Sequence, residues 1–419
     1  MDLFGPLVTF LLSVLYVWVL YNTPILVMGV KQMCSLSSKR RNKEMKRDSF
    51  PSVSIVVPVK DEEKVIGRLL KALSKLDYPQ DKKEIIIVED ASKDKTAEIC
   101  EEFAEQHPNA VRFYHRSISN GKPSALNFGF KHARNDIVAV FDADNVPEPD
   151  ALLGAAKYFD DPSVAAVQGT TSIMNADENM LTKFISYEEA VWLKNYLQGK
   201  DVLNLFVPLT GSCQFIRRET AEKVGSWDEN SLAEDLEMSA KMTERGFKIR
   251  YAPDIISWQE ATSSLTQLIR QRIRWFRGYM EVAVKYGRFL KRLEKRSLDA
   301  EVTLMGPFVL TLFLANYIIS IATSVFLSHP DPVLVAMSRL TLLLTTVTLL
   351  IAGIALMYVT KPRRAKNLLW LPFIYAYWSL QSILTTYAFF QVIFRRPKSW
   401  VKTTKTGSCT KKDVYAYNH

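Results

Sequence analysis

Four long stretches of the sequence contain no charged residue, and they constrain the fold more than any other feature. They cover residues 3–30, 302–330, 340–360 and 367–394. A helix needs about 20 apolar residues to cross a hydrocarbon core about 30 Å thick, so each stretch is long enough to span a bilayer. The first stretch could instead be a signal peptide, but it is preceded by Asp2 and exceeds the usual apolar length of such a peptide. We therefore expect an integral membrane protein.

Positive charge accumulates beside these apolar stretches. The chain carries 54 Lys and Arg against 44 Asp and Glu, a net charge of +10. Basic clusters over residues 31–50, 285–296 and 395–419 more than account for this excess, so the rest of the chain is acidic. The charge therefore indicates membrane flanks and no nucleic-acid partner. Four separated cysteines without a CxxC pair also exclude a disulfide framework and a zinc knuckle.

The same charge pattern predicts an orientation. Basic flanks stay on the cytoplasmic side of the cell membrane, which places the region between residues 31 and 301 in the cytoplasm. A fourth full crossing would then put the basic tail, 395–419, outside. Either the charge rule fails here, or one apolar segment lies in the membrane interface instead of crossing it.

The region between the apolar stretches alternates between two patterns. Short apolar runs typical of buried strands occur at residues 53–57, 85–88, 111–114, 137–141 and 164–168. Helical spacing follows or precedes them at residues 62–75, 93–106 and 124–133. This alternation predicts an α/β domain with a mostly parallel sheet. Ligands of such sheets bind beyond the carboxyl ends of the strands, so catalytic residues are expected there.

Candidate site residues, most of them polar, follow four of these predicted strands. They are Pro58, Val59 and Glu62 after the first strand, Glu89 and Asp90 after the second, Lys122 after the third, and Asp142 and Asp144 after the fourth. Two carboxylates at a strand end suit a divalent cation and the phosphates of a substrate, whereas a solvated turn is the plainer alternative. Neither a dinucleotide fingerprint nor a P-loop is present.

Two further motifs lie closer to the C terminus. Glu234 and Asp235 begin a helix-like stretch, where acids commonly cap the helix or interact with its dipole, but where Asp235 could also serve as a general base. Gln271, Arg274 and Trp275 lie in an amphipathic basic stretch, 264–284, that suits an interfacial helix. Gln271 and Arg274 share a helix face and could reach a diphosphate together.

Taken together and in this order, the motifs resemble those of the membrane-bound family-2 glycosyltransferases, the group that includes cellulose, chitin and hyaluronan synthases. The resemblance covers residues 53–280, and Gln271-x-x-Arg274-Trp275 is its most specific part. Two positions depart from the family pattern. Lys60 and Asp61 replace the usual Tyr-Asn, and Glu89 replaces the usual Asp, so the identity of the nucleotide base stays open.

The resemblance implies a Rossmann-like GT-A catalytic domain, a UDP- or GDP-sugar donor and Mg²⁺ or Mn²⁺. It implies that Asp235 is the catalytic base, that Asp144 and Asp142 hold the metal, and that Glu234 and Trp275 contact the acceptor. The other implied residues contact the nucleotide-sugar, and they are Pro58, Val59, Glu62, Glu89, Asp90, Lys122, Asp142, Gln271 and Arg274.

The reaction implied is an inverting transfer in which one displacement on an α-linked donor gives a β-linked product. The acceptor is expected to be a growing polysaccharide, and a single transfer to a lipid-linked acceptor is the alternative. A transporter and an Asp-x-Asp phosphatase are rival classes. The first needs polar groups within its spans, and the second needs an Asp where the chain has Pro58.

The expected division of the chain has six parts. They are an N-terminal transmembrane helix, 1–30, a basic linker, 31–50, the catalytic domain, 51–260, amphipathic interfacial helices, 261–301, a C-terminal transmembrane region, 302–394, and a basic tail, 395–419.

Overall fold

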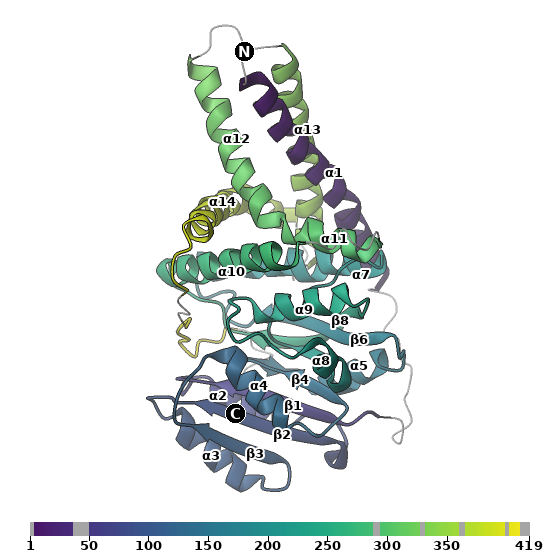
Figure 1. Ribbon diagram of the computed structural model, residues 1–419, viewed down its shortest axis with the longest axis vertical. Helices are drawn as coiled ribbons and strands as arrows, with labels where there is room; N and C mark the ends of the chain where they lie inside the picture. Colours follow the sequence, from purple (N-terminus) through teal and green to yellow (C-terminus); the bar gives the residue numbers. More distant parts are fainter. Residues whose placement is uncertain are drawn as a thin grey trace.

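A computed structural model describes residues 4–36, 50–287, 294–326, 332–359, 365–398 and 402–410. An α/β domain forms one end of the molecule, and three long helices, α1, α12 and α13, extend from the other end (Figure 1). Between them lies a layer that contains α10, α11 and α14 (Figure 1). The expected basic linker is described only up to residue 36 and at residue 50, and the last nine residues of the tail lie outside the described part.

The α/β domain is built on one eight-stranded sheet with the order β3-β2-β1-β4-β7-β6-β8-β5. Strands β3, β2, β1 and β4 are parallel, whereas β7 runs antiparallel to both of its neighbours. The predicted mostly parallel α/β sheet is therefore confirmed, and all five predicted strands form. The strands are β1 (Val53–Val59), β2 (Lys83–Asp90), β3 (Val111–Arg116), β4 (Ile137–Val140), β5 (Val146–Pro147), β6 (Val164–Ile173), β7 (Gln214–Arg217) and β8 (Lys248–Gln259).

Helices cover both faces of this sheet because its central strands are buried on both sides. All seven residues of β1 are buried. Ile55 packs in a cluster with Leu69 of α2, and its neighbour Val56 packs on the opposite face with Leu126 of α4. Helix α4 approaches β1 closely, because a Cβ atom at Gly129 would lie 2.5 Å from a methyl group of Val56.

The helices of the molecule begin and end as follows. They are α1 (Phe4–Leu36), α2 (Ile66–Ser74), α3 (Thr96–Gln106), α4 (Lys122–His132), α5 (Ala151–Tyr158), α6 (Met180–Glu189), a π-helix (Ala190–Leu197), α7 (Gln198–Val202), α8 (Arg218–Val224), α9 (Glu234–Glu244), α10 (Leu265–Tyr286), α11 (Lys295–Leu304), α12 (Gly306–Phe326), α13 (Pro332–Val359) and α14 (Leu371–Ile393), with short 3₁₀ turns at Gln80–Lys82 and Ala365–Trp370.

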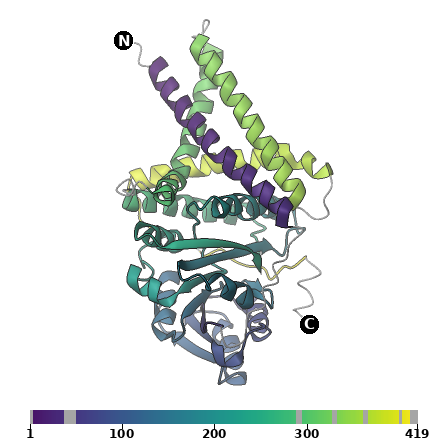
Figure 2. The ribbon, with the colours of Figure 1, turned by 90° about the vertical axis from the view of Figure 1, so that its right-hand side faces the viewer.

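The four apolar stretches form helices α1, α12, α13 and α14, but these helices do not all run in one direction. Helix α14 lies across the ends of the other three, alongside α10 (Figures 1 and 2). Of the two alternatives that the charge pattern left open, this direction agrees with an apolar segment that does not cross. The expectation of about three crossing segments in the C-terminal region stays a prediction.

Within the described residues, one helix is long and apolar enough to cross a bilayer, Thr9–Cys34. A second candidate is the pair Lys295–Leu304 and Gly306–Ile318, which is bent by 47° between its two parts. The expected division of the chain into six parts stays a prediction.

Helix α1 is joined to the α/β domain by close packing and by a buried ion pair. A Cβ atom at Gly199 would lie 2.0 Å from the carbonyl oxygen of Ile25, so α1 and α7 meet at their backbones. Next to this contact, Lys200 Nζ lies 2.9 Å from Asp299 Oδ2, and both side chains are fully buried. Tyr21 of α1 donates a hydrogen bond to the same carboxylate. Asp299 therefore links α1, α7 and α11.

Candidate active site

The carboxyl ends of β1 and β2 lie side by side and form the first part of the candidate site. Pro58 and Val59 pair with Val88 and Glu89 in parallel register. Glu89 is completely buried, and its carboxylate accepts a hydrogen bond from the Ser92 amide at 2.5 Å and contacts His115 Nδ1 at 2.5 Å.

Asp90 ends β2 and is held from two sides. Its Oδ2 atom accepts a hydrogen bond of 2.6 Å from the Ser119 hydroxyl, and its Oδ1 atom lies 3.2 Å from Arg116 Nη1. Asp90 therefore has a fixed orientation at the carboxyl end of β2, the strand next to β1.

Lys122 gathers several of the predicted residues around its ammonium group. Its Nζ atom lies 2.6 Å from Asp142 Oδ1 and 3.5 Å from Glu234 Oε1, and it donates a hydrogen bond of 3.1 Å to the Gly211 carbonyl. Burial alone would lower the pKa of Lys122, but the carboxylates of Asp142 and Glu234 raise it above its usual value. Lys122 thus stays charged and neutralises carboxylates that arrive from β4 and α9.

Asp235, the predicted base, lies at the start of α9 beside this cluster. A Cβ atom at Gly211 would lie 3.1 Å from Asp235 Oδ2, and Gly211 has a φ of +87°, so this loop needs glycine for both reasons. Burial, together with the charge of Glu234, raises the pKa of Asp235 to about 7. A carboxyl group with such a pKa can exchange a proton near neutral pH.

Helix α10 brings the Gln271-x-x-Arg274-Trp275 motif to the same place. Burial lowers the pKa of Arg274, and the nearby charges of Glu234, Asp235 and Asp142 oppose this shift. Its Nε atom is buried and has no hydrogen-bond partner among the described residues. Arg274 is therefore available to an anionic ligand. Trp275 lies next along the helix, with the Arg272 guanidinium 4.5 Å from its ring centroid.

The most unexpected part of the site is a C-terminal segment, residues 402–410, which we call the strap. It returns from α14 to the α/β domain (Figure 2). The carboxylate of Glu260 accepts hydrogen bonds from the backbone amides of Thr406, at 2.6 Å, and Gly407, at 3.0 Å. Arg68 also holds the strap against Glu260, because its guanidinium contacts the Glu260 carboxylate at 3.1 Å and donates a hydrogen bond of 3.1 Å to the Gly407 carbonyl.

The strap delivers two lysines to predicted site carboxylates. Lys405 Nζ lies 2.6 Å from Asp144 Oδ2, and Lys402 Nζ lies 3.0 Å from Glu62 Oε1. Burial would raise the pKa of Asp144, but the ammonium of Lys405 holds it below its usual value. Burial raises the pKa of Glu62 to about 7 in spite of Lys402. Between these two lysines, the hydroxyl of Thr403 accepts a hydrogen bond of 3.4 Å from the Gln271 side chain.

These contacts correct one interpretation of the sequence. The charge pattern predicts that the basic tail is a membrane flank, yet three of its lysines pair with the catalytic part of the chain: Lys398 with Glu281, Lys402 with Glu62 and Lys405 with Asp144. The reason is local charge, since acidic side chains at the site attract these cations. Glu260, Lys402 and Lys405 were missed by the sequence analysis, and no motif or periodicity distinguishes them.

The residues present fit a divalent cation at Asp142 and Asp144. Among the described residues no three His, Cys, Asp or Glu side chains are grouped so as to hold an ion unaided. However, Mg²⁺ is commonly bound by one or two carboxylates together with substrate phosphates. Asp144 also attracts a cation in this structure, the ammonium of Lys405. Asp144 and Asp142 would thus hold a metal ion with the help of a phosphorylated donor.

Comparison with known proteins identifies the family of this chain. Residues 51–278 match the family described as "Glycosyltransferase like family 2". "Probable glycosyltransferase YdaM" of Bacillus subtilis is 34% identical over 292 residues, which cover 68% of this chain and 69% of that protein. "Beta-monoglucosyldiacylglycerol synthase" of Synechocystis is 33% identical, over 58% of this chain and 50% of the relative.

Two other proteins extend the comparison. "Poly-beta-1,6-N-acetyl-D-glucosamine synthase" of Staphylococcus epidermidis is 30% identical, over 56% of each chain. This chain thus spans only about half to two thirds of the length of these relatives. Among solved structures, a mannosyltransferase of Pyrobaculum calidifontis in complex with GDP-Man and Mn²⁺ covers 92% of this chain and 100% of its own, with a TM-score of 0.59 and 20% identity. That likeness supports the GT-A fold. From the extent of the family match and the shared fold, the chain belongs to the family-2 glycosyltransferases.

Proposed function

We propose that this glycosyltransferase is a membrane-bound inverting enzyme that moves a sugar from a nucleoside-diphosphate sugar to a hydroxyl group of a membrane-borne acceptor. The single observation that carries the proposal is the arrangement around Asp235. Its side chain is partly buried, has a pKa of about 7, and lies with Glu234, Lys122 and Arg274 where β4, α9 and α10 meet.

Asp235 is the proposed general base. Its deprotonated carboxylate takes the proton of the acceptor hydroxyl while the oxygen attacks the anomeric carbon and the bond to the diphosphate breaks. Base assistance of this kind contributes about 10²–10⁴-fold to a rate. No second carboxylate has to attack the sugar, so one displacement inverts the anomeric configuration.

The second requirement of the reaction is that the negative charge on the leaving diphosphate is neutralised. Arg274 has an unpaired buried Nε atom, and Lys122 lies beside Asp142, so both can bind phosphate oxygens once the donor arrives. A bound Mg²⁺ or Mn²⁺ at Asp144 and Asp142 would supply further charge neutralisation. We propose that the nucleoside binds at the carboxyl ends of β1 and β2. The residues predicted to contact it there are Pro58, Val59, Glu89 and Asp90.

The acceptor class is the finer part of the proposal. Two of the relatives named above are a glycolipid synthase and a polysaccharide synthase by name, and the sequence favours a growing polysaccharide. An apolar groove beside α1, described below, could hold a lipid chain, either of an acceptor or of a bound membrane lipid. In either case we propose that Trp275 and Glu234 contact the acceptor and that the catalytic domain faces the cytoplasm.

A donor screen tests this proposal. Purified protein is incubated with single UDP- and GDP-sugars and Mn²⁺, with and without extracted membrane lipids, and both nucleotide release and product size are measured. The proposal predicts nucleotide release that depends on acceptor, and a β-linked product by NMR. An α-linked product from an α-linked donor, or no difference between wild type and Asp235→Asn, would contradict it.

A further inference from the structure

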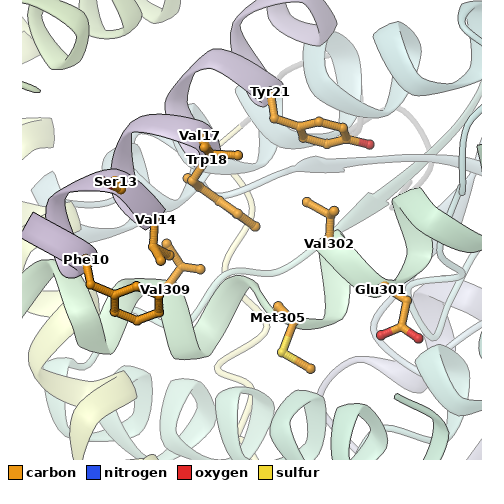
Figure 3. A pocket seen from close by; sticks show the side chains of 10 residues that line it. All are labelled: Phe10, Ser13, Val14, Val17, Trp18, Tyr21, Glu301, Val302, Met305 and Val309. Carbon is orange, nitrogen blue, oxygen red and sulfur yellow. The ribbon is translucent and has the colours of Figure 1, made fainter. Parts of the chain in front are cut away.

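An apolar groove of about 430 Å³ lies between α1 and the bent pair α11–α12, on the side of α11 away from the catalytic centre. Phe10, Val14 and Trp18 of α1 form one wall, and Val302, Met305 and Val309 form the other (Figure 3). A groove of this volume is within the range of small-molecule sites. One turn of an α-helix about 10 Å across takes up roughly 400 Å³, so the groove is too small for a partner helix.

The groove has one polar end. Figure 3 shows the carboxylate of Glu301 at the opposite end from Phe10. The Oε1 atom of Glu301 is buried and has no hydrogen-bond partner among the described residues. A buried polar atom without a hydrogen-bond partner is destabilising, and more so when it is charged. Glu301 therefore lacks a hydrogen-bond donor at the place where the apolar walls end.

The two hydroxyl groups of the groove are already paired within the protein. Tyr21 donates its hydroxyl to Asp299, and Ser13 donates its hydroxyl to the Thr9 carbonyl at 2.8 Å. Neither can supply the proton that Glu301 accepts. A ligand that satisfies both ends must combine an apolar chain with a hydrogen-bond donor, and a carboxylate at the polar end disfavours an anionic head group.

The position of the groove relates it to the catalytic centre through α11. Ala300 and Leu304 of α11 pack in one cluster with Leu236 of α9, the helix that begins with the catalytic residues. The adjacent Glu301 and Val302 line the groove instead. One helix thus separates the polar end of the groove from α9.

We propose that this groove binds an acyl chain of a neutral lipid and that Glu301 accepts a hydrogen bond from a hydroxyl of its head group. Diacylglycerol and neutral glycolipids have this chemistry. The inference rests on the membrane-bound character of the proposed function. It applies both to a lipid acceptor and to a membrane lipid that stays bound as part of the structure.

The test uses the full-length protein in phosphatidylcholine nanodiscs with a diacylglycerol that carries a photoreactive diazirine in one acyl chain. A phosphatidylglycerol with the same modified chain is the anionic comparison. After irradiation, mass spectrometry locates the labelled peptides. We expect labelling of residues 10–18 and 302–309, and at least fivefold more labelling by diacylglycerol than by phosphatidylglycerol.

Three variants make the test specific. Val14→Trp fills the groove and should reduce labelling at least fivefold, whereas Leu20→Trp, on an exposed position of the same helix, should leave it unchanged. Glu301→Met removes the acceptor at similar size and should abolish the preference for diacylglycerol while labelling persists. Equal labelling by the two lipids in the wild type, or no response to Val14→Trp, would overturn the proposal.

Failure of this inference can be distinguished from failure of the proposed function. Asp235→Asn should stop sugar transfer and leave the lipid labelling as in the wild type. Sugar transfer to the labelled lipid would identify it as an acceptor, and labelling without transfer would identify it as a bound membrane lipid. Transfer to lipid without any labelling of the groove would overturn the inference and keep the function.

Discussion

Lys405 and Asp144 offer the sharpest test of how the strap acts on the candidate site. Their charged atoms are 2.6 Å apart, and only 14% and 9% of the two side chains are exposed. In Lys405→Met, Asp144 keeps only weak contacts, from the Glu260 amide at 3.3 Å and the Asn145 side-chain amide at 3.3 Å. Loss of one partner from a buried pair costs about 3 kcal/mol or more.

The expected cost is measurable by thermal unfolding. For a domain of this size, 1 kcal/mol corresponds to about 2–4 °C in Tm, so Lys405→Met should unfold about 6–12 °C below the wild type at pH 7. Because Lys405 depresses the pKa of Asp144, this stabilisation is present above the ordinary Asp pKa and is lost as the pH falls through the depressed one. The difference between the two proteins should therefore persist from pH 7 down to the ordinary Asp pKa of 3.8 and shrink only below it.

The response to a divalent cation is the more specific measurement. In the wild type, a metal ion at Asp144 has to displace an ammonium group, whereas in Lys405→Met the carboxylate is free. A ligand at 100 times its Kd stabilises a protein by about 2.7 kcal/mol, so Mn²⁺ should raise the Tm of Lys405→Met by several degrees more than that of the wild type.

Controls come from the same stretch of chain. Lys398→Met removes a lysine that is half-exposed and pairs with Glu281, away from Asp144, and should cost at most about 1 kcal/mol. In the double variant Asp144→Asn/Lys405→Met, the two losses should be less than additive. Equal Mn²⁺ shifts in wild type and Lys405→Met, or a Tm no lower than that of Lys398→Met, would refute the reasoning.

Four further predictions concern the reaction. Asp235→Asn should lower kcat about 10²–10⁴-fold with little change in donor Kd by calorimetry, whereas the exposed Glu244→Gln at the other end of α9 should be unaffected. Because the carboxylate form of Asp235 is the active one, kcat/KM should rise with pH through about 7, and Glu234→Gln should move this rise to lower pH. Trp275→Ala should raise the acceptor KM about tenfold, the equivalent of 1.4 kcal/mol, more than it weakens donor binding; the reverse order would remove Trp275 from the acceptor site. Excess EDTA should abolish transfer, and Asp144→Ala should lose the response to added Mn²⁺; full activity in EDTA would exclude the metal.

The sheet and much of the candidate site were predictable because their signals are local. Strands β1 and β2 are buried on both faces, which requires continuous apolar runs in the sequence. Parallel strands bring their carboxyl ends to one edge, so the positions of Asp90 and Asp142 followed from the strand pattern. The approach of Arg274 to Asp235 was implied only by the family resemblance, since no local pattern fixes how α10 packs on α9.

The strap and the direction of α14 could not be predicted for a physical reason. The contact between Asp144 and Lys405 joins residues far apart in the chain, and a lysine in a basic tail looks the same whether it meets lipid phosphates or a buried carboxylate. Likewise, apolar composition sets how long a helix can be in an apolar environment but not its direction. Both features depend on tertiary packing.

The transverse path of α14 decides on which side the polypeptide finishes. Helices α12 and α13 run away from the α/β domain and back as a pair, and α14 runs across their ends before Lys402 reaches Glu62, just after β1. If α12 and α13 each cross a bilayer, a further crossing by α14 would leave residues 402–410 unable to touch the sheet. A fluorescent protein fused after residue 419 should therefore report from the same compartment as one inserted beside the catalytic strands.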